Sequence, residues 1–303
     1  MEVIFLGTSG SMPTNKRNLP AVAILRKDEL ILFDCGEGTQ RQMILAHIGF
    51  NRKTKIFITH MHGDHVLGIP GLIQSMALLG RTEKLEIYSP PGMKNFVKSI
   101  SRTVKFTLTF PVEVFEVHEG IVHQNNEYQV QAVQTSHVIP GLAYALIERN
   151  RPGKFHPEKA RALGVPKGPL WSKLQRGEDI RLPKGKIVKS RNVTGPPRPG
   201  RKIVYSGDTR PFKVILKLAR KADMLIHEAT FADELAERAK RDGHSTPSQA
   251  AKIAKTARVK RLVLTHISAR YANADILVKK ARKIFPRTQF AEDLLRIELP
   301  YAE

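Results

Sequence analysis

The chain has 303 residues, of which 41% are hydrophobic and 26% charged, a composition typical of folded globular proteins and not of disordered ones. Its single cysteine, Cys35, excludes a disulfide framework and fits a reducing compartment. No apolar run reaches the roughly 18 residues of a membrane span, and no signal-peptide pattern opens the sequence. We therefore expect a cytoplasmic protein without a membrane partner.

The charge is unevenly distributed. Fifty Lys and Arg against 28 Asp and Glu give a formal net charge of +22. Of this, +13 falls in Arg149–Lys202, where 54 residues hold 16 basic and three acidic side chains. The same segment contains eight prolines, seven glycines and Trp171, the only tryptophan. Such a concentration indicates a polyanionic partner, which for most basic globular proteins is a nucleic acid. We interpret the segment as a basic insertion.

On either side of this segment, strand-like and helix-like patterns alternate, which predicts an α/β fold. Runs rich in Val, Ile, Phe and Thr predict strands at Val3–Leu6, Ala21–Leu25, Leu30–Phe33, Lys55–Thr59, Leu85–Tyr88, Val112–Val117, Tyr128–Thr135, Ala143–Glu148, Lys202–Ser206, Met224–His227, Arg261–Thr265 and Leu294–Leu299. Helical patterns predict helices at Thr39–His47, Pro70–Leu79, Met93–Ser101, Pro211–Arg220, Ala232–Lys240, Pro247–Ala257 and Ile276–Ile284. The helix at Pro247 has the strongest start signal, with Thr246 as its cap and Gln249 at its third position.

Four groups able to bind a metal follow the fourth predicted strand within six residues. They are His60, His62, Asp64 and His65, and Gly63 between them permits a sharp turn. Imidazole and carboxylate ligands without thiolate suit Zn²⁺, with Mn²⁺, Fe²⁺ or Co²⁺ as competitors. A lone histidine is more often structural, but four such groups together favour a metal site.

Three other predicted strands end in a further candidate ligand. His137 follows the strand at Tyr128, Asp208 follows the strand at Lys202, and His266 follows the strand at Arg261. Each alone has an ordinary alternative, namely a core hydrogen bond for His137, a helix cap for Asp208 and a surface position for His266. Together the seven residues, five His and two Asp, suit a pair of metals bridged by one carboxylate.

The segment Thr59-His60-Met61-His62-Gly63-Asp64-His65, with a later His, Asp and His after strands, resembles the metallo-β-lactamase superfamily. The resemblance implies a four-layer αββα sandwich with a dinuclear metal site at the sheet edges. It further implies that His60, His62 and His137 bind one metal, that Asp64, His65 and His266 bind the other, and that Asp208 bridges them. This signature alone does not distinguish lactamases, thioester hydrolases, phosphodiesterases and nucleases.

Several local motifs narrow the choice. Phe5–Pro13, Phe33–Gln40, His227-Glu-Ala-Thr230, His244-Ser-Thr246 and Leu264–Arg270 resemble ribonuclease Z, the zinc-dependent endoribonuclease that removes 3′ trailers from precursor tRNA. The resemblance covers essentially the whole chain, as a single domain over residues 1–303. It makes the basic segment 149–202 that family's flexible arm, a binding surface for tRNA, with Gly168 and Pro169 as its Gly-Pro element. One departure is the position of Lys16 in Pro13–Asn18, which is shifted by one residue from the family pattern.

The resemblance also implies roles for further residues. Asp64 would act as the general base, and His244, oriented by Glu228, would protonate the departing 3′ oxygen, leaving a 3′-hydroxyl on the tRNA and a 5′-phosphate on the trailer. Lys16, Arg17 and Arg270 are candidate phosphate contacts, although surface charge is their ordinary reading. The family also implies two Zn²⁺ ions per subunit and a homodimer.

Three local predictions concern supporting residues. Asp34 is expected to brace the ligand loops, and Cys35 beside it is expected to be packed rather than reactive. The stripe of Leu72, Ile73, Met76 and Leu79 is expected to be core or a dimer face.

Two other classes of function remain open at this point. A hydrolase of small esters or phosphodiesters would need no basic arm. An RNA-binding protein with a structural metal would more often use a closed, cysteine-rich zinc site.

Overall fold

The computed structural model describes residues 1–301, except for the side chains of Lys184 and Ile276. The chain divides into two compact units. Unit 1 comprises Met1–Asn125, Gln129–Ile147 and Lys202–Pro300, and unit 2 comprises Asn126–Tyr128, Glu148–Arg201 and Tyr301. In the described part of the chain, no helix has both the length and the apolar character needed to cross a membrane.

The first sheet of unit 1 has seven strands in the order β18-β1-β3-β4-β5-β6-β7. They are β1 (Glu2–Gly7), β3 (Ala21–Arg26), β4 (Glu29–Phe33), β5 (Lys53–Phe57), β6 (Leu85–Ser89), β7 (Val112–Glu116) and β18 (Arg296–Glu298). The strands from β4 to β7 run parallel, and the pairs β18–β1, β1–β3 and β3–β4 are antiparallel. Parallel strands are covered on both faces, which explains the unbroken apolar run in β4.

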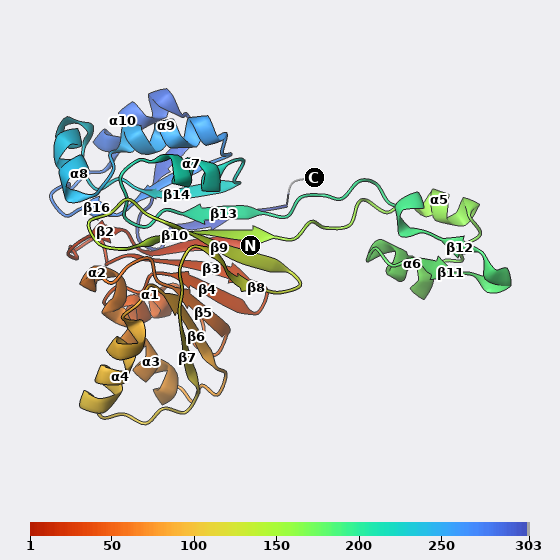
Figure 1. Ribbon diagram of the computed structural model, residues 1–303, viewed down its shortest axis with the longest axis horizontal. Coiled ribbons are helices and arrows are strands. Elements are labelled where there is room, and N and C mark those ends of the chain that lie inside the picture. Colours follow the sequence, from red (N-terminus) through yellow and green to blue (C-terminus); the bar gives the residue numbers. More distant parts are fainter. Residues whose placement is uncertain (302–303) are drawn as a thin grey trace. The chain divides into compact units, whose positions relative to one another are not determined.

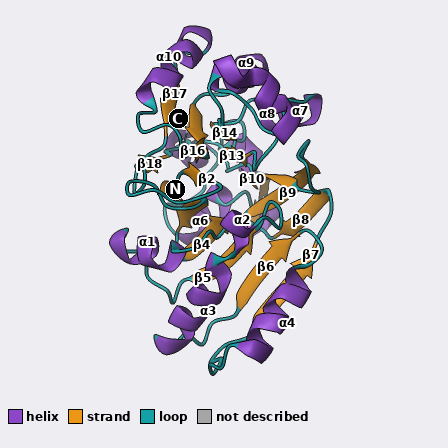
Figure 2. Ribbon diagram, turned by 90° about the vertical axis from the view of Figure 1, so that its left-hand side faces the viewer, coloured by secondary structure: helices purple, strands orange, loops and turns teal. Residues whose placement is uncertain are grey.

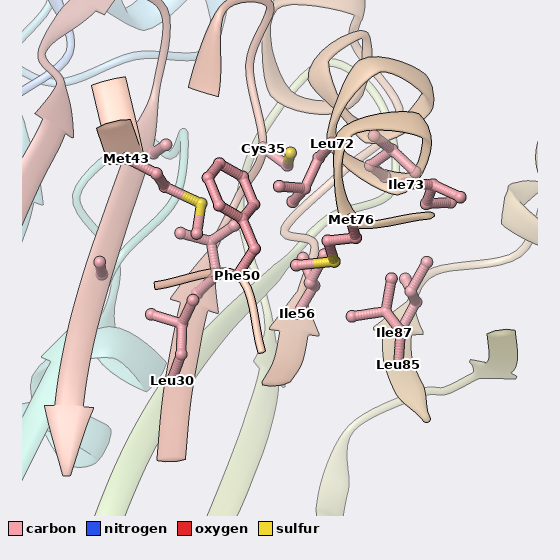
Figure 3. Packing of buried hydrophobic residues seen from close by; sticks show 14 of the residues in the cluster. Leu30, Cys35, Met43, Phe50, Ile56, Leu72, Ile73, Met76, Leu85 and Ile87 are labelled. Atoms are coloured by element: carbon pink, nitrogen blue, oxygen red, sulfur yellow. The ribbon is translucent and has the colours of Figure 1, made fainter. Parts of the chain in front are cut away.

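Helices α1 (Thr39–Leu45), α3 (Gly68–Leu78) and α4 (Met93–Thr103) cover the outer face of this sheet. Figure 3 shows Met43 of α1 and Met76 of α3 packed among Leu30, Ile56 and Ile87 of the strands. All five side chains are completely buried. Burial of apolar area on this scale is the main driving force for closing the layer.

The second sheet also has seven strands, in the order β17-β15-β14-β13-β10-β9-β8. They are β8 (Gly120–Gln124), β9 (Tyr128–Gln134), β10 (Leu142–Glu148), β13 (Lys202–Tyr205), β14 (Met224–Glu228), β15 (Leu262–Thr265) and β17 (Thr288–Phe290). From β13 to β17 the neighbours run parallel. Their carboxyl ends therefore lie at one edge, where α/β proteins usually bind ligands.

Helices α7 (Lys213–Ala219), α9 (Pro247–Ala257) and α10 (Asp275–Ile284) pack on the outer face of the second sheet, and α8 (Ala236–Asp242) lies near them (Figures 1 and 2). The expected cap of α9 is present: Thr246 Oγ1 accepts a hydrogen bond from the Gln249 N–H, and Gln249 Oε1 accepts one from the Thr246 N–H. This reciprocal pair satisfies two N–H groups that the helix leaves open.

Aromatic rings fill the space between the two sheets. Phe33 of the first sheet stacks on Tyr205 and Tyr144 of the second, with ring centroids 5.4 and 6.0 Å apart. Phe57 meets Tyr144 edge-on at 5.5 Å. The Tyr144 hydroxyl donates to the Ile58 carbonyl at 2.7 Å, so its polar end is satisfied. Two packed sheets with helices outside confirm the predicted αββα sandwich.

Unit 2 has a small core of its own. Its elements are α5 (Pro157–Ala162), α6 (Pro169–Gln175), β11 (Ile180–Arg181), β12 (Ile187–Val188) and the 3₁₀ turns Pro183–Gly185 and Ser190–Asn192. Trp171 and Leu174 of α6 pack with Ala160, Val165 and Val188. The Trp171 indole donates to the Val165 carbonyl at 3.1 Å. The apolar residues that interrupt this basic segment therefore have a structural reason.

The two ends of the long segment of unit 2 are joined to each other. Arg201 makes a bidentate pair with Glu148, with Nε–Oε2 and Nη2–Oε1 distances of 2.8 Å. The guanidinium carbons of Arg151 and Arg201 each lie 3.7 Å from the centroid of the Tyr301 ring. The ion pair is nearly buried, and a bidentate geometry of this kind is among the stronger side-chain contacts. It closes the base of the segment.

All twelve predicted strands and all seven predicted helices are present, with shifted ends. The strand expected to end at Thr59 ends at Phe57, because the Thr59 N–H bonds the Asp34 carboxylate instead of a neighbouring strand. The helix expected from Ala232 begins as a 3₁₀ turn, Asp233–Leu235, before α8. Within the two large sheets, strands β8 and β17 were not predicted: β8 is mostly exposed and β17 has three residues, so neither carries a clear apolar pattern.

Candidate metal centre

The loop after β5 carries the first candidate ligands. It continues through His60 into a short helix, α2 (Gly63–Val66), with the extended His62 as its N-cap. His60 Nε2 lies 2.9 Å from His62 Nδ1. His137 follows β9, and its Nε2 lies 3.3 Å from the same His62 atom. Three imidazole nitrogens therefore converge, as expected from the sequence, and they form the first donor set.

The second donor set lies on the other side of Asp208. His65 Nε2 and His266 Nε2 are each 3.5 Å from Asp64 Oδ2. Asp208 Oδ2 is 3.8 Å from His60 Nε2 in the first set, and 3.6 and 3.3 Å from the Nε2 atoms of His65 and His266 in the second. One carboxylate oxygen therefore lies within reach of both sets. Gly207 before it has a φ of +56°, a conformation that glycine adopts at little cost.

The outer nitrogens of the histidines are held by hydrogen bonds. His60 Nδ1 contacts Thr59 Oγ1 at 2.9 Å and His266 Nδ1 contacts Thr230 Oγ1 at 2.8 Å. His137 Nδ1 donates to the Gly243 carbonyl at 2.8 Å. Such contacts orient the rings and fix which nitrogen is free to bind a metal. The three Nε2 atoms are thereby left directed toward the centre.

The same logic applies to His65, whose Nδ1 lies 2.7 Å from Asp34 Oδ2. The Asp34 carboxylate also accepts the Thr59 N–H at 2.7 Å and the Tyr205 hydroxyl at 2.9 Å. Asp34 therefore lies where a brace for the ligand loop was expected. Cys35 is buried in the apolar core, and burial raises the pKa of its thiol to about 12, so it is not a reactive thiolate.

The donor atoms fit divalent metals chemically. Among the residues that the structure describes, His65 Nε2, His266 Nε2 and Asp208 Oδ1 are buried and have no hydrogen-bond partner, which is costly unless another group satisfies them. Burial lowers the pKa values of His60, His62 and His137, which favours the neutral imidazole that binds metals. The cluster of five His and two Asp therefore has the donor groups that a divalent-metal site requires.

Both carboxylates of the cluster are held in the ionised form. Burial opposes their charge, but His266 and His65 hold the pKa values of Asp64 and Asp208 well below their ordinary range. The Ser11 N–H also donates to Asp64 Oδ2 at 2.8 Å. This contact could not be predicted from the sequence, because every residue except proline has a backbone N–H and the residue type does not show which one donates to Asp64.

Glu228 and His244 form a hydrogen-bonded pair beside the cluster. His244 Nδ1 donates to Glu228 Oε1 at 2.9 Å and lies 3.8 Å from Asp208 Oδ2. Burial disfavours the charged imidazole, but Glu228 outweighs it and raises the pKa of His244 to about 9. Thr230 Oγ1 donates to Glu228 Oε2 at 2.7 Å and also contacts His266. Glu228 is thus connected to His244 directly and to a metal-site histidine through one hydroxyl.

Thr209 and Arg210, the two residues that follow Asp208, connect the loops of this site by hydrogen bonds. Thr209 donates its N–H to Glu228 Oε1 at 2.9 Å, and its hydroxyl accepts the Ser136 N–H at 3.0 Å. The Arg210 guanidinium donates to the carbonyls of Ser136, Lys240 and Arg241, at 3.1, 2.5 and 3.2 Å. Sequence reasoning assigned Arg210 no role. It ties the loop that carries His137 to the end of α8, which precedes His244.

The residues predicted to contact RNA fall in both units. In unit 1, Lys16 and Arg17 line a cavity of about 570 Å³, and Arg17 Nη1 donates to the Tyr271 carbonyl at 3.2 Å. Arg270 lines a second cavity, beside His244. In unit 2, Gly168 and Pro169 begin α6, and Gly168 has a φ of +150°.

An αββα sandwich with this cluster at its strand ends defines a metal-dependent hydrolase of the metallo-β-lactamase superfamily. A family model described as a β-lactamase superfamily domain matches residues 192–267, and one described as anti-Pycsar protein Apyc1 matches residues 1–151. A solved structure from Bacillus subtilis, the metallo-β-lactamase-fold protein YhfI, is similar with a TM-score of 0.69 over 98% of each chain, at 17% identity.

The particular family follows from closer relatives. The chain is 49% identical to ribonuclease Z of Methanosarcina acetivorans over 99% of both chains. It is 47% identical to ribonuclease Z of Methanothermobacter thermautotrophicus, covering 99% of this chain and 97% of that protein. Human tRNase Z, short form, superposes with a TM-score of 0.74 at 30% identity, over 99% of this chain and all of that one.

The chain belongs to the ribonuclease Z family. It is therefore a metal-dependent endoribonuclease, as the resemblance in its motifs predicted.

We expect Asp208→Ala to lower the content of bound divalent metal more than His137→Ala does. The reason is that Asp208 Oδ2 lies within 4 Å of nitrogens from both donor sets, whereas His137 belongs to one set. Elemental analysis of both variants after dialysis, with thermal unfolding as a check on folding, measures the difference. Full metal retention in Asp208→Ala would remove this carboxylate from the centre.

Proposed function

We propose that the chain removes the 3′ trailer from precursor tRNA, with two Zn²⁺ ions per subunit and as a homodimer. The observation that supports the reaction most directly is the hydrogen-bonded Glu228–His244 pair, in which His244 Nδ1 lies 3.8 Å from Asp208 Oδ2 of the carboxylate shared by both donor sets. It supplies a proton donor next to a site built for hydrolysis. Mn²⁺, Fe²⁺ or Co²⁺ bind the same ligand types and are the alternatives to zinc.

The ligands divide between two metals by their proximity. His60, His62 and His137 would hold one ion, Asp64, His65 and His266 the other, and Asp208 both. When bound, two such ions activate water and stabilise charge on the phosphoryl oxygens.

Asp64 takes the role of general base in this proposal. Its carboxylate is ionised, and the Ser11 N–H fixes Oδ2 at 2.8 Å. With one oxygen fixed in this way, the carboxylate has a defined orientation in which to receive the proton of the attacking water. General bases act through such hydrogen-bond contact with the proton that they remove.

His244 takes the role of general acid. Because Glu228 raises its pKa to about 9, the imidazole carries a proton near neutral pH. It gives this proton to the departing 3′ oxygen as the P–O bond breaks, so the tRNA leaves with a 3′-hydroxyl and the trailer keeps a 5′-phosphate. Acid catalysis of this kind is worth roughly 10²–10⁴-fold in rate.

Unit 2 provides the charge for holding tRNA. Most of its Lys and Arg side chains are exposed, and Arg149–Lys202 carries a net +13. Gly168 and Pro169 belong to this surface, while Lys16, Arg17 and Arg270 are phosphate contacts in unit 1. Basic side chains that neutralise phosphates release counterions, which gives affinity without sequence readout.

An exposed apolar surface supports the homodimer. Ile44 and Leu45 of α1, Leu67 before α3, Leu78 at its end and Leu79 beyond are 46–80% exposed. Helices α1 and α3 are neighbours in unit 1. Of the predicted stripe, Leu72, Ile73 and Met76 are core residues, whereas Leu79 belongs to this surface. A second copy of the chain is the proposed occupant, because several exposed apolar side chains on neighbouring helices commonly mark an interface.

Cleavage of a tRNA transcript with a 3′ extension tests the proposed function. We expect one cut, on the 3′ side of the last nucleotide before the trailer, with a 5′-phosphate on the released fragment. Sequencing of the two products locates the cut and end-labelling identifies the ends. A protein that hydrolyses a nitrophenyl phosphodiester but leaves this transcript intact would be the small-ester hydrolase instead.

Removal of the basic segment should separate binding from chemistry. We expect a short Gly/Ser hairpin in place of Arg149–Gly200 to lower precursor-tRNA affinity by orders of magnitude and to flatten its salt dependence, since each phosphate contact contributes about −0.7 to −0.9 to the slope. The Glu148–Arg201 pair stays in this design and keeps the two ends together. Affinity titrations at several salt concentrations measure both effects.

The matched control for this deletion keeps unit 2 folded. Lys159, Lys167 and Lys173 are exposed side chains outside its core, and their joint replacement by Gln should weaken binding partially in the same direction. Hydrolysis of a small phosphodiester should survive the deletion, because all seven proposed ligands lie outside it. Unchanged cleavage of precursor tRNA by the deletion variant at moderate salt would exclude unit 2 as the binding surface.

The His244→Ala variant should slow cleavage of RNA strongly and hydrolysis of a nitrophenyl phosphodiester much less. A nitrophenolate departs without protonation, whereas a ribose 3′ oxygen needs a proton. Turnover numbers on both substrates, with metal content measured in parallel, give the comparison. Equal penalties on the two substrates would indicate that His244 positions other groups and is not the acid.

A further inference from the structure

A cavity of about 500 Å³ opens beside His244. Residues of four segments line it, among them Ser11, Phe231, Arg238, His244 and Arg270. Its volume falls within the range of sites that hold one small-molecule-sized group, and a single nucleotide is of that size. Among these five side chains, only His244, as the general acid, and Arg270, as a phosphate contact, have a role in the function proposed above.

Two arginine side chains in this cavity are supported by one aromatic ring. The guanidinium carbons of Arg238 and Arg270 lie 5.3 and 5.1 Å from the centroid of the Phe231 ring. Phe231 is itself buried, and its ring meets the His244 imidazole edge-on at 5.7 Å. Cation–π contacts of this kind hold a guanidinium in place.

Each guanidinium has a second anchor. Arg238 Nε donates to Asp242 Oδ2 at 3.3 Å, one helical turn along α8, and Arg270 Nε donates to Ser268 Oγ at 3.0 Å. About 45% of the Arg238 side chain remains exposed. A planar cation is therefore held at the edge of the cavity with part of its surface free. Arginine planes in such positions stack on the bases of single-stranded nucleic acids.

We propose that this cavity holds the last nucleotide that the RNA keeps after cleavage, and that Arg238 stacks on its base. The inference rests on the proposed function, in which His244 protonates the departing 3′ oxygen. That oxygen belongs to the ribose of this nucleotide, so the nucleotide must lie next to His244, and His244 lines the cavity. Arg238 is thus a positioning residue for the scissile bond.

Stacking also fits a substrate with a variable nucleotide. Every base offers a face to a guanidinium plane, so this contact selects no particular base. The cavity therefore determines where the RNA is cut, but it does not restrict which nucleotide precedes the cut.

The test uses Arg238→Ala and a matched control on the same helix. Arg241 also pairs with Asp242, with Nε–Oδ1 at 2.9 Å, but its side chain is 72% exposed and does not line the cavity. Both substitutions remove one positive charge. We expect Arg238→Ala to lower kcat/KM on precursor tRNA about tenfold and Arg241→Ala to change it little. Arg238→Lys should recover only a minor part, because lysine keeps the charge and loses the plane.

The decisive measurement combines each protein with a precursor that lacks the base of the last retained nucleotide. If Arg238 stacks on that base, Arg238→Ala and the abasic substrate lose the same interaction, and their penalties are not additive. The control substrate lacks the base of the first trailer nucleotide, where the two penalties should add. Metal content and thermal unfolding of the variants show that the site is intact.

The outcomes separate this inference from the function on which it rests. Additive penalties at the last retained nucleotide, or an equal loss in Arg241→Ala, would overturn the stacking contact while precursor cleavage by the unaltered protein stands. If the penalties of Arg238→Ala and of the abasic first trailer nucleotide were non-additive instead, the cavity would hold the nucleotide on the trailer side of the cut. An unaltered protein that does not cleave the intact precursor would overturn the proposed function and this inference together.

Discussion

The hydrogen bonds of the buried Asp34 carboxylate hold the loop that carries the candidate metal ligands in place. Asp34 follows β4 of the first sheet. Its carboxylate accepts the N–H of Thr59, two residues after β5, contacts His65 farther along the same loop, and accepts the hydroxyl of Tyr205 from the second sheet. One side chain thus joins both sheets to the ligand loop. Because Asp34 Oδ2 engages His65 Nδ1 at 2.7 Å, the His65 ring is held with Nε2 as the nitrogen left for a metal.

A second carboxylate organises the chemistry on the other side of the centre. Glu228 Oε1 holds His244 and the Thr209 N–H, while Oε2 holds Thr230, whose hydroxyl also contacts His266. The proposed acid and a proposed metal ligand are therefore oriented by one buried group. A change at Glu228 would consequently affect proton donation and metal geometry together. Acid catalysis is therefore better measured with His244→Ala than with a Glu228 variant, by comparing its rate loss on substrates with different leaving groups.

Much of this arrangement could be predicted from the sequence, for a physical reason. His137, Asp208 and His266 each follow an apolar run. The strands before Asp208 and His266 belong to the parallel part of the second sheet, which brings such positions to one edge. The supporting contacts could not be predicted in the same way. Tyr205 is an ordinary core residue by its pattern, and the carbonyls that bind Arg210 and the N–H of Ser11 belong to the backbone. Only the fold brings these partners together.

Charge and stacking have different roles in the proposed reaction. Phosphate contacts by the basic segment depend on a repeating backbone, so they give affinity but cannot by themselves determine which bond is cut. The position of the cut must come from contacts close to the scissile phosphate. The cavity lined by Arg238, Phe231 and His244 offers such contacts. His244, which would protonate the 3′ oxygen, is itself one of the residues that line the cavity. The cut is then fixed by the nucleotide that fits beside the acid.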